Sequence, residues 1–260
     1  MVWSCLVSIL PGMAQTEKLT DYVNPFVGTD GYGNVYPGAQ IPFGGIQISP
    51  DTDSRFYDAA SGYKYNHLTL MGFSLTHLSG TGIPDLGDFL FIPGTGEMKL
   101  EPGTHEDPDQ GYRSRYSHDK EWASPNYYAV ELADYGVKAE MTSGVRSGMF
   151  RFTYPESDNA FIMIDMNHTL WQSCEWSNLR MINDSTITGY KLVKGWGPER
   201  HVYFRATFSK KLTGLRFVQD KKPVIYNTSR FRSSYEAWGK NLMACISFDT
   251  KAGEEVTVKT

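Results

Sequence analysis

Apolar and polar residues alternate along short segments from about residue 126 onward. Apolar side chains at 137, 139 and 141 alternate with polar ones at 138, 140 and 142, and residues 150–154 and 202–208 repeat the pattern. Because successive side chains of a strand point to opposite faces, a period of two predicts half-buried strands. Further strands are expected over 161–166, 186–191, 242–248 and 254–259.

Turn-forming residues separate these segments at 133–136, 155–158 and 183–185. No segment has the pattern of an amphipathic helix of three turns. The sequence therefore predicts an all-β fold, an antiparallel β-sandwich of the supersandwich type. The last strand runs to residue 260 without a terminating turn, so we expect the natural protein to continue.

The first third of the chain has a different character. Residues 22–96 hold many of the chain's 25 glycines among aromatic residues and prolines. Such a density of glycine predicts long loops and tight turns. Loops on a rigid sandwich are where binding surfaces are usually found, so this stretch is the candidate for contact with a ligand.

Length and charge narrow the possible functions. A chain of 260 residues can bury a sizeable core, and we expect one large domain rather than two. The 25 Lys and Arg nearly balance the 29 Asp and Glu, and neither sign forms a long run. This balance argues against nucleic acid or an anionic membrane as the partner. An aromatic content of 14% is compatible with sugar binding.

Residues 1–14 are typical of the remnant of a signal peptide, with an apolar run followed by a Pro-Gly turn and a small residue. The basic start of such a peptide is missing, and a buried N-terminal strand is the alternative. The run is too short to span a bilayer. We therefore expect an exported protein, periplasmic or extracellular, whose mature part is 15–260. Surface anchoring through Cys5 stays open, although its surroundings match a lipobox poorly. Cys174 and Cys245 could pair, or each could be a small buried residue.

The loop at 27–38 superficially contains a G-x-x-G-x-G pattern. A dinucleotide loop needs a following helix, and Pro37 and Pro42 exclude one here. We expect instead a surface loop whose backbone approaches a ligand at Gly33, with Asn34 as a hydrogen-bonding side chain. A structural turn without a ligand is the alternative.

Two further candidates lie shortly downstream. Asp51 and Asp53 could bind calcium, but a calcium loop needs more oxygen ligands, and a turn around Pro50 explains them better. Tyr57 could stack on a sugar ring or could simply be a core residue.

Polar groups are densest in residues 71–82, which are followed by Asp85 and Asp88. A Ser-His-Asp triad is conceivable, but no G-x-S-x-G elbow is present and Ser79 lies too near His77 in sequence. A zinc site is also disfavoured, because His67 lies ten residues away. The segment is typical of pocket lining, with a structural histidine as the alternative. The candidate residues are His77, Ser79, Gly80 and Thr81.

Several long stretches resemble a known family. They include VGTDGYGNVYPGAQIPFGGIQISPDT, SGYKY, MGFSLTHLSGTG and LGDFLFIPG, and downstream MIDMNH, ITGYKLVKGW and VYFRATFSK. In this order they closely resemble the N-terminal domain of glycoside hydrolase family 92, the calcium-dependent exo-α-mannosidases. The resemblance extends over essentially the whole chain after residue 14.

The resemblance implies a two-domain enzyme, in which this sandwich precedes a helical domain of the (α/α)-barrel type. It implies inverting hydrolysis of terminal α-linked mannose, with the catalytic acid, the catalytic base and most calcium ligands in the helical domain. No catalytic or metal-binding residue is therefore assigned to this chain. The implied partners are mannose-containing glycans and the C-terminal helical domain of the same protein.

Residue by residue, the resemblance implies a role in substrate binding. Gly33 and Asn34 would lie at the pocket, Tyr57 would stand where the family often has Trp beside the outer sugar, and residues 77–82 would line or support the site. Leu75 and the pair at 59–60 depart from the family pattern, so the linkage preference stays open.

Two functions follow as hypotheses. The full-length protein is an α-mannosidase of which this chain alone is inactive, or the sandwich is a stand-alone carbohydrate-binding or structural module. An apolar face that meets the helical domain is also expected. Trp171, Trp176 and Trp196 are candidates for that face, with a core position as the alternative.

Overall fold

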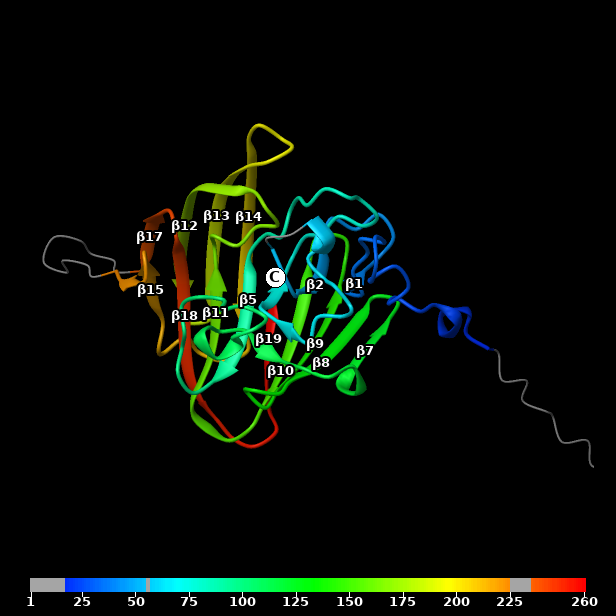
Figure 1. The fold of residues 1–260 in the computed structure, drawn as a ribbon. Coiled ribbons are helices and arrows are strands. Elements are labelled where there is room, and N and C mark those ends of the chain that lie inside the picture. The colour runs from blue at the N-terminus through cyan, green and yellow to red at the C-terminus, as the bar shows by residue number, and fades with distance from the viewer. Residues whose placement is uncertain (1–16, 55–56, 225–234) are drawn as a thin grey trace, which may run out of the picture.

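The computed structural model describes residues 17–54, 57–224 and 235–260. Two large antiparallel sheets pack face to face (Figure 1). This arrangement confirms the predicted all-β sandwich. The predicted signal-peptide remnant at 1–14 lies outside the described residues.

One sheet has eight strands. In spatial order these are β1 (Ala39–Gln40), β2 (Gln47–Asp51), β4 (Gly72–Ser74), β5 (Leu90–Thr95), β11 (Ser157–Asp165), β18 (Leu242–Thr250), β15 (Arg216–Gln219) and β16 (Lys222–Pro223). Four of them come from the glycine-rich first third, so this part of the chain is also a structural part of the sandwich.

The other sheet has nine strands. In spatial order these are β17 (Glu236–Gly239), β12 (Ser173–Asn183), β13 (Thr186–Lys194), β14 (Arg200–Phe208), β19 (Glu254–Lys259), β10 (Gly148–Tyr154), β9 (Val137–Ser143), β8 (Tyr127–Leu132) and β7 (Glu121–Ser124). A separate pair is formed by β3 (Thr69–Leu70) and β6 (Ser114–Arg115).

The core lies between the two sheets, and the alternation seen in the sequence places its side chains. Along β10, Phe150, Phe152 and Tyr154 are buried, while the residues between them are more exposed. Phe91 of the opposite sheet lies 5.0 Å from Phe150, measured between ring centroids, and Phe73 lies 6.4 Å from Phe152. Each buried ring contributes about 1.5–3 kcal/mol through removal of apolar surface from water.

The predicted strands are found as β9, β10, β11, β13, β14, β18 and β19. The turn expected at 155–158 is shorter than predicted, because β11 begins at Ser157. Ser157 pairs with Thr250, and the register shifts before Ala160. The polar residues at the start of β11 therefore belong to an irregular, exposed strand end rather than to a turn.

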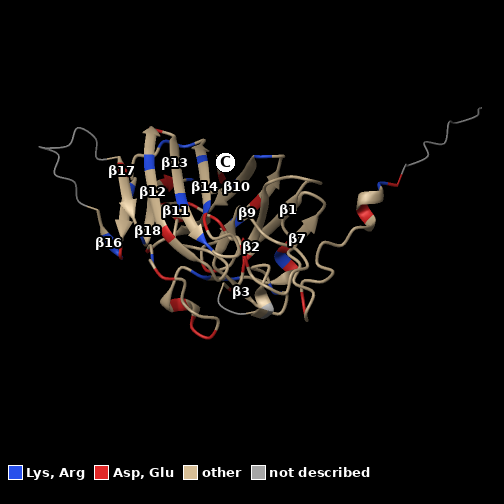
Figure 2. Cartoon of the chain, turned by 90° about the horizontal axis from the view of Figure 1, so that it is seen from above, with Lys and Arg blue, Asp and Glu red and all other residues tan. Residues whose placement is uncertain are grey.

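Helices contribute little to the described part of the chain. It contains four short 3-10 helices, η1 (Leu19–Tyr22), η2 (Tyr57–Ala59), η3 (Pro108–Gln110) and η4 (His118–Lys120), and no α-helix. None of them is long and apolar enough to cross a membrane. Acidic and basic residues are distributed over both strands and loops (Figure 2).

The two cysteines of the described region are free and buried. Cys174 lies on β12 and Cys245 on β18, which belong to different sheets. Burial raises the pKa of both thiols. Of the two interpretations of these residues, the structure supports separate burial.

Candidate functional site

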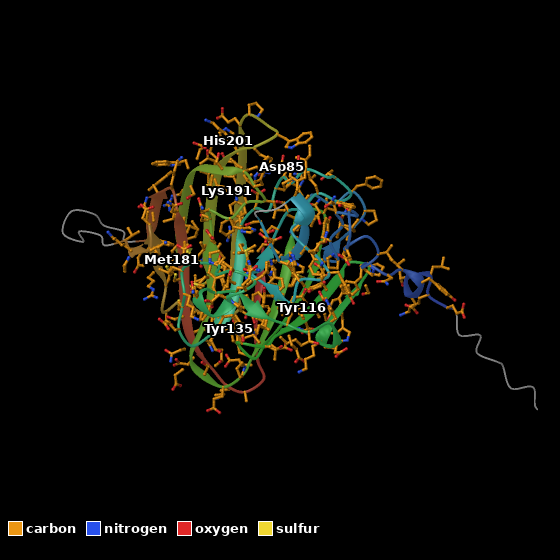
Figure 3. All side chains as sticks on the ribbon, in the orientation of Figure 1. Asp85, Tyr116, Tyr135, Met181, Lys191 and His201 are labelled. Atoms are coloured by element: carbon orange, nitrogen blue, oxygen red, sulfur yellow. The ribbon has the colours of Figure 1, made fainter. Side chains whose placement is uncertain are left out.

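Five connecting segments meet beside the strand ends shown at the top of Figure 1. We call them the loop cluster; they are residues 28–38, 52–54 with 57–62, 75–89, 166–172 and 195–199. Backbone bonds join them: Gly80 N donates to Asn34 O over 2.7 Å, and Leu170 N donates to Leu86 O over 3.0 Å. In Figure 3, Asp85, Lys191 and His201 lie toward this end of the sandwich, whereas Tyr135 lies toward the other.

A buried carboxylate forms the first centre of the loop cluster. Asp51, the last residue of β2, is fully buried. His77 Nε2 lies 2.8 Å from its Oδ1, and His168 Nε2 lies 2.7 Å from its Oδ2. Burial opposes ionisation of this group, but the two histidines outweigh that effect and hold the pKa of Asp51 well below its usual range. Asp51 is therefore an ionised carboxylate that joins two other loops.

The histidine beside Asp51 is itself fixed on both sides. His77 Nδ1 donates to Gln47 O over 2.7 Å, and Ser74 Oγ lies 3.1 Å from Nε2. The Tyr36 ring packs 5.0 Å from the His77 ring, measured between centroids. These contacts leave only 3% of His77 exposed, so its side chain supports the loop cluster from the interior instead of facing solvent.

Gly62 is required for this packing. It has a φ of +86°, and a Cβ added there would lie 2.1 Å from Asp51 Oδ1 and 3.2 Å from His77 Cδ2. Both the left-handed backbone and the close approach exclude other residues. The turn after η2 is thereby held directly against the buried carboxylate.

A second buried carboxylate lies at Asp88. Lys191 Nζ is 3.1 Å from its Oδ1, with both side chains fully buried, and Arg200 donates to its Oδ2. Thr76 Oγ1 also donates to Oδ2 over 2.8 Å. Burial opposes ionisation here too, but Lys191 and Arg200 outweigh it and lower the pKa of Asp88. Asp88 therefore ties the 75–89 loop to β13 and β14.

The two centres are connected. Lys191 Nζ donates to His168 O over 2.6 Å, and Arg200 also donates to Gln172 Oε1 over 3.2 Å. The 166–172 loop is thus held by Asp51 on one side and by the cations around Asp88 on the other. Both carboxylates are buried and paired with side chains from other segments, which makes both centres supporting structures rather than free acids or bases.

No group of three or more His, Cys, Asp or Glu residues is arranged to hold a metal within the described parts of the chain. Asp53, the other carboxylate considered for calcium, accepts from Ser54 N over 2.7 Å and lies 3.3 Å from His105 Nε2. Its bond to the next residue fits a local turn. The contacts of Asp51 and Asp53 with protein groups therefore account for both carboxylates without calcium.

The structure brings the predicted Gly33 and Asn34 next to the predicted Gly80. A Cβ at Gly33 would lie 2.1 Å from Gly28 O, so the close packing within this turn already requires glycine at position 33. Asn34 has a φ of 51°, and its Nδ2 donates to Tyr32 O over 3.2 Å. Its Oδ1 is buried and has no hydrogen-bond partner among the described residues.

The other predicted residues of the 75–89 loop lie at the surface. Ser79 and Gly80 are exposed, and Thr81 is half-buried with its Oγ1 donating to Ile83 O over 3.1 Å. Gly80 has a φ of +76° with open space around its Cα. These residues are at least partly accessible to solvent, in contrast to the buried His77.

Tyr57 lies in η2 and is 57% exposed. Its ring packs edge-on against Trp171, with centroids 5.9 Å apart and planes at 64°. The core alternative for Tyr57 is therefore wrong. Trp171, Trp176 and Trp196 are likewise exposed by 60%, 46% and 68%.

Sequence reasoning missed several residues that organise the loop cluster. His168 lies inside the stretch MIDMNH, shortly after a strand that ends in a run of consecutive buried residues, and that position could have marked it. Lys191 occupies an inward position of β13, where a lone lysine among apolar neighbours signals a buried partner. Arg200 offers no such signal in the sequence.

Another buried carboxylate, Glu121, lies outside the loop cluster. Glu121 accepts from Tyr63 OH over 2.9 Å and from Tyr128 OH over 2.5 Å, and His118 Nδ1 lies 2.6 Å away. Near it a hollow of about 640 Å³ is lined by Tyr116, Lys120 and others. All acceptors and donors of this group are paired inside the sandwich, so we assign it a structural role.

Comparison with solved structures places this architecture among sugar-cleaving enzymes. The gh92 family glycosyl hydrolase ccman5 matches over 92% of this chain with a TM-score of 0.75 and 25% identity. The Family GH92 inverting mannosidase from Bacteroides thetaiotaomicron matches over 94% with a TM-score of 0.75 and 24% identity, which supports the fold alone. In both cases the chain spans 32% of the matched structure. The fold thus belongs to one part of a glycosyl hydrolase.

Residues 22–260 match the N-terminal domain of glycosyl hydrolase family 92, and the chain belongs to this family. An uncharacterized secreted glycosidase from Arthroderma benhamiae is 30% identical over 139 residues, which are 53% of this chain and 17% of that protein. The expectation drawn from the sequence stretches is thereby confirmed at the level of family and domain.

Proposed function

We propose that this chain is the N-terminal domain of an exported α-mannosidase and that its loop cluster forms one wall of the sugar pocket. The observation that carries the proposal is the meeting of the predicted binding residues at one end of the sandwich. Gly33, Asn34 and Gly80 lie together there, and Tyr57 stands exposed on a neighbouring loop. Membership of a glycosyl hydrolase family supports a glycoside as the substrate, and the resemblance of the sequence stretches to α-mannosidases motivates the choice of mannose.

The loop cluster suits binding better than catalysis. Asp51 and Asp88 are buried and neutralised by neighbouring side chains, so neither can exchange protons with a substrate. An inverting glycosidase needs two carboxyl groups roughly 6.5–9.5 Å apart with a water between them. We propose that both groups, and calcium as the cofactor, belong to a C-terminal helical domain. This chain would bind and orient the sugar.

Export is part of the proposal. The apolar run at 2–10 has the pattern of a signal peptide, and the relative from Arthroderma benhamiae is named a secreted glycosidase. Secretion would bring the protein to glycans outside the cytoplasm. Mass spectrometry of the mature N-terminus after expression with the natural leader tests this point.

Hydrolysis of aryl α-mannoside by the full-length protein tests the main proposal, with aryl β-mannoside and aryl α-glucoside as controls. We expect turnover of the α-mannoside only, loss of turnover on chelation of calcium, and recovery when calcium is added back. Residues 15–260 alone should show no turnover. Turnover by this chain alone would contradict the assignment of the carboxylates, and binding of mannobiose without turnover by the full-length protein would favour a carbohydrate-binding module.

A further inference from the structure

The outer face of the nine-stranded sheet carries large aromatic side chains. Trp238 of β17 and Tyr203 of β14 are 54% and 71% exposed, and Tyr190 of β13 lies half-buried between them. Outward positions of an antiparallel sheet are normally polar, and a single exposed ring needs no explanation. Several rings on neighbouring strands do need one, because apolar patches on a protein surface commonly mark binding sites.

The strand register places these rings in one row. Trp238 is paired with Asn178 of β12, and Asn178 is paired with Tyr190. Tyr190 is in turn paired with Tyr203. Residues directly opposite each other on neighbouring strands project from the same face of a sheet. The row therefore crosses the four adjacent strands β17, β12, β13 and β14, with aromatic side chains at both ends and an amide between them (Figure 1).

Contacts within the protein hold the middle of this row in place. The rings of Tyr190 and Tyr203 lie 4.9 Å apart, measured between centroids, with their planes at 34°. The Tyr190 hydroxyl lies 3.0 Å from His201 Nδ1, and Asn178 Nδ2 donates to Ala237 O over 3.1 Å. These side chains are therefore ordered before a ligand arrives, so that little of their rotational freedom has to be lost on binding.

A hollow of about 430 Å³ lies along the row, and all four of its residues line the hollow together with Thr188. Small-molecule sites have volumes of ~300–1,000 Å³ and combine aromatic walls with a few polar groups. The lining here offers aromatic rings, hydroxyl groups and an amide, and none of the described residues that line it carries a charge. Arg180 and Arg205 lie in the next row, on either side of Thr188 and outside the lining.

We infer that this hollow is a second glycan-binding site, which takes a neutral pyranose unit of an oligosaccharide or polysaccharide. The C–H groups of a pyranose carry slight positive charge and suit the negative face of an aromatic ring. Its hydroxyl groups can bond to Asn178, Thr188 and the tyrosine hydroxyls. The uncharged lining favours a neutral sugar over a sulfated or uronic one, because an ionised group would lose water there without gaining a charged partner.

The hollow is separate from the loop cluster. Tyr190 lies four positions before Lys194, the last residue of β13, so roughly 13 Å of strand separates it from the loop at 195–199. The inference goes beyond the proposed function, because cleavage of a terminal sugar at the loop cluster does not require a contact on this face. A contact here would give the protein a second point of attachment to a large glycan and so raise the local concentration of sugar chains.

The test is affinity electrophoresis of the full-length protein in native gels that contain soluble α-mannan, galactomannan or dextran, with calcium chelated to prevent turnover. We expect at least one of these neutral polysaccharides to retard the wild type. Tyr203→Ala and Trp238→Ala should each raise the dissociation constant about three- to tenfold through loss of one stacking contact, with thermal midpoints close to that of the wild type. Unchanged retardation in both variants, or no retardation of the wild type in any of the three gels, would overturn the inference.

Matched variants separate the rings from other causes. Trp122 is 45% exposed on β7, the opposite edge strand of the same sheet, so Trp122→Ala should migrate like the wild type. Tyr203→Phe keeps the aromatic face and should retain most of the affinity. The inference fails if Trp122→Ala weakens retardation equally or if Tyr203→Phe behaves like Tyr203→Ala. Retardation by alginate alone would assign binding to Arg180 and Arg205 and would also overturn it.

Fluorine NMR of the same protein labelled with 5-fluorotryptophan locates the contact. The Trp238 signal, identified by its loss in Trp238→Phe, should shift when an oligosaccharide prepared from the retarding polysaccharide is added, and the Trp122 signal should not. A shift at Trp238 in a protein that hydrolyses no α-mannoside would support this site and refute only the proposed activity. Turnover of α-mannoside without a shift at Trp238 would overturn only this site.

Discussion

Removing the charge of Asp51 should destabilise the whole domain. Asp51→Asn keeps the shape of the side chain and one acceptor, but its amide turns a donor toward a histidine N–H. The wild-type bonds measure 2.8 Å to His77 and 2.7 Å to His168, and a hydrogen bond to a charged group is worth about 1.5–3 kcal/mol. Loss of one bond and the new donor–donor contact predict a decrease of about 3 kcal/mol in the free energy of unfolding.

Urea unfolding at pH 7 measures this change directly. For a domain of this size, about 3 kcal/mol corresponds to a decrease of roughly 6–12 °C in the melting temperature. Asp109→Asn is the matched control, because Asp109 is an exposed carboxylate paired with Arg115, and its replacement should leave the midpoint close to wild type. A decrease below about 1 kcal/mol for Asp51→Asn would refute the view that this carboxylate holds the loops together.

The difference in the free energy of unfolding between wild type and Asp51→Asn should also depend on pH. The folded pKa of Asp51 lies below its unfolded value of about 3.9, so the stability it contributes is fully present above that pH. As the pH falls below it, that contribution is progressively lost. The difference in stability between wild type and Asp51→Asn should therefore shrink as the pH falls below ~4. A difference that grows on acidification would contradict an ionised Asp51 in the folded state.

Three further outcomes are expected. Gly62→Ala should cost at least about 3 kcal/mol, because the new methyl group meets a buried carboxylate, whereas Gly80→Ala should cost only about 1–2 kcal/mol for its positive φ. Equal losses in urea unfolding would refute the role assigned to the close contact. Lys191→Met should lower stability by roughly 3–5 kcal/mol, since it leaves a buried carboxylate with one cation fewer; a wild-type melting curve would contradict this. Peptide mapping should find Cys174 and Cys245 alkylated only after unfolding, because both thiols are buried and burial raises their pKa. Rapid labelling of the native protein would contradict this expectation.

The sequence predicted those parts of the fold that depend on local alternation. β10 has the period of two in a clear form, with Phe150 and Phe152 inward, and it lies where expected. The same reasoning missed β12, because its alternation is broken twice. The register shifts between Cys174 and Trp176, and the fully buried position at Ser177 carries a hydroxyl whose Oγ donates to Gly239 O. An inward hydroxyl with a partner distant in sequence breaks the pattern on which the prediction rests.

The candidate site was predictable only in part, for a related reason. Gly33, Asn34, Tyr57 and residues 77–82 are close in sequence and form recognisable stretches, so they could be grouped beforehand. The burial of His77 could not be predicted, because it depends on contacts between its ring and two groups of β2, Gln47 O and the Asp51 carboxylate. Trp171 was predicted only as a candidate for the face that meets the helical domain, because nothing in the sequence indicates its φ of +70°.

The bond between Asp51 and His168 joins residues 117 positions apart, and Arg200 reaches Asp88 across 112 positions. Contacts of such separation form late in folding, because the loop-closure entropy must be paid before they contribute. The loop cluster should therefore acquire its native shape only after β11, β13 and β14 have joined their sheets. During synthesis the first third of the chain would leave the ribosome with its part of the loop cluster unformed, and the second half would complete it.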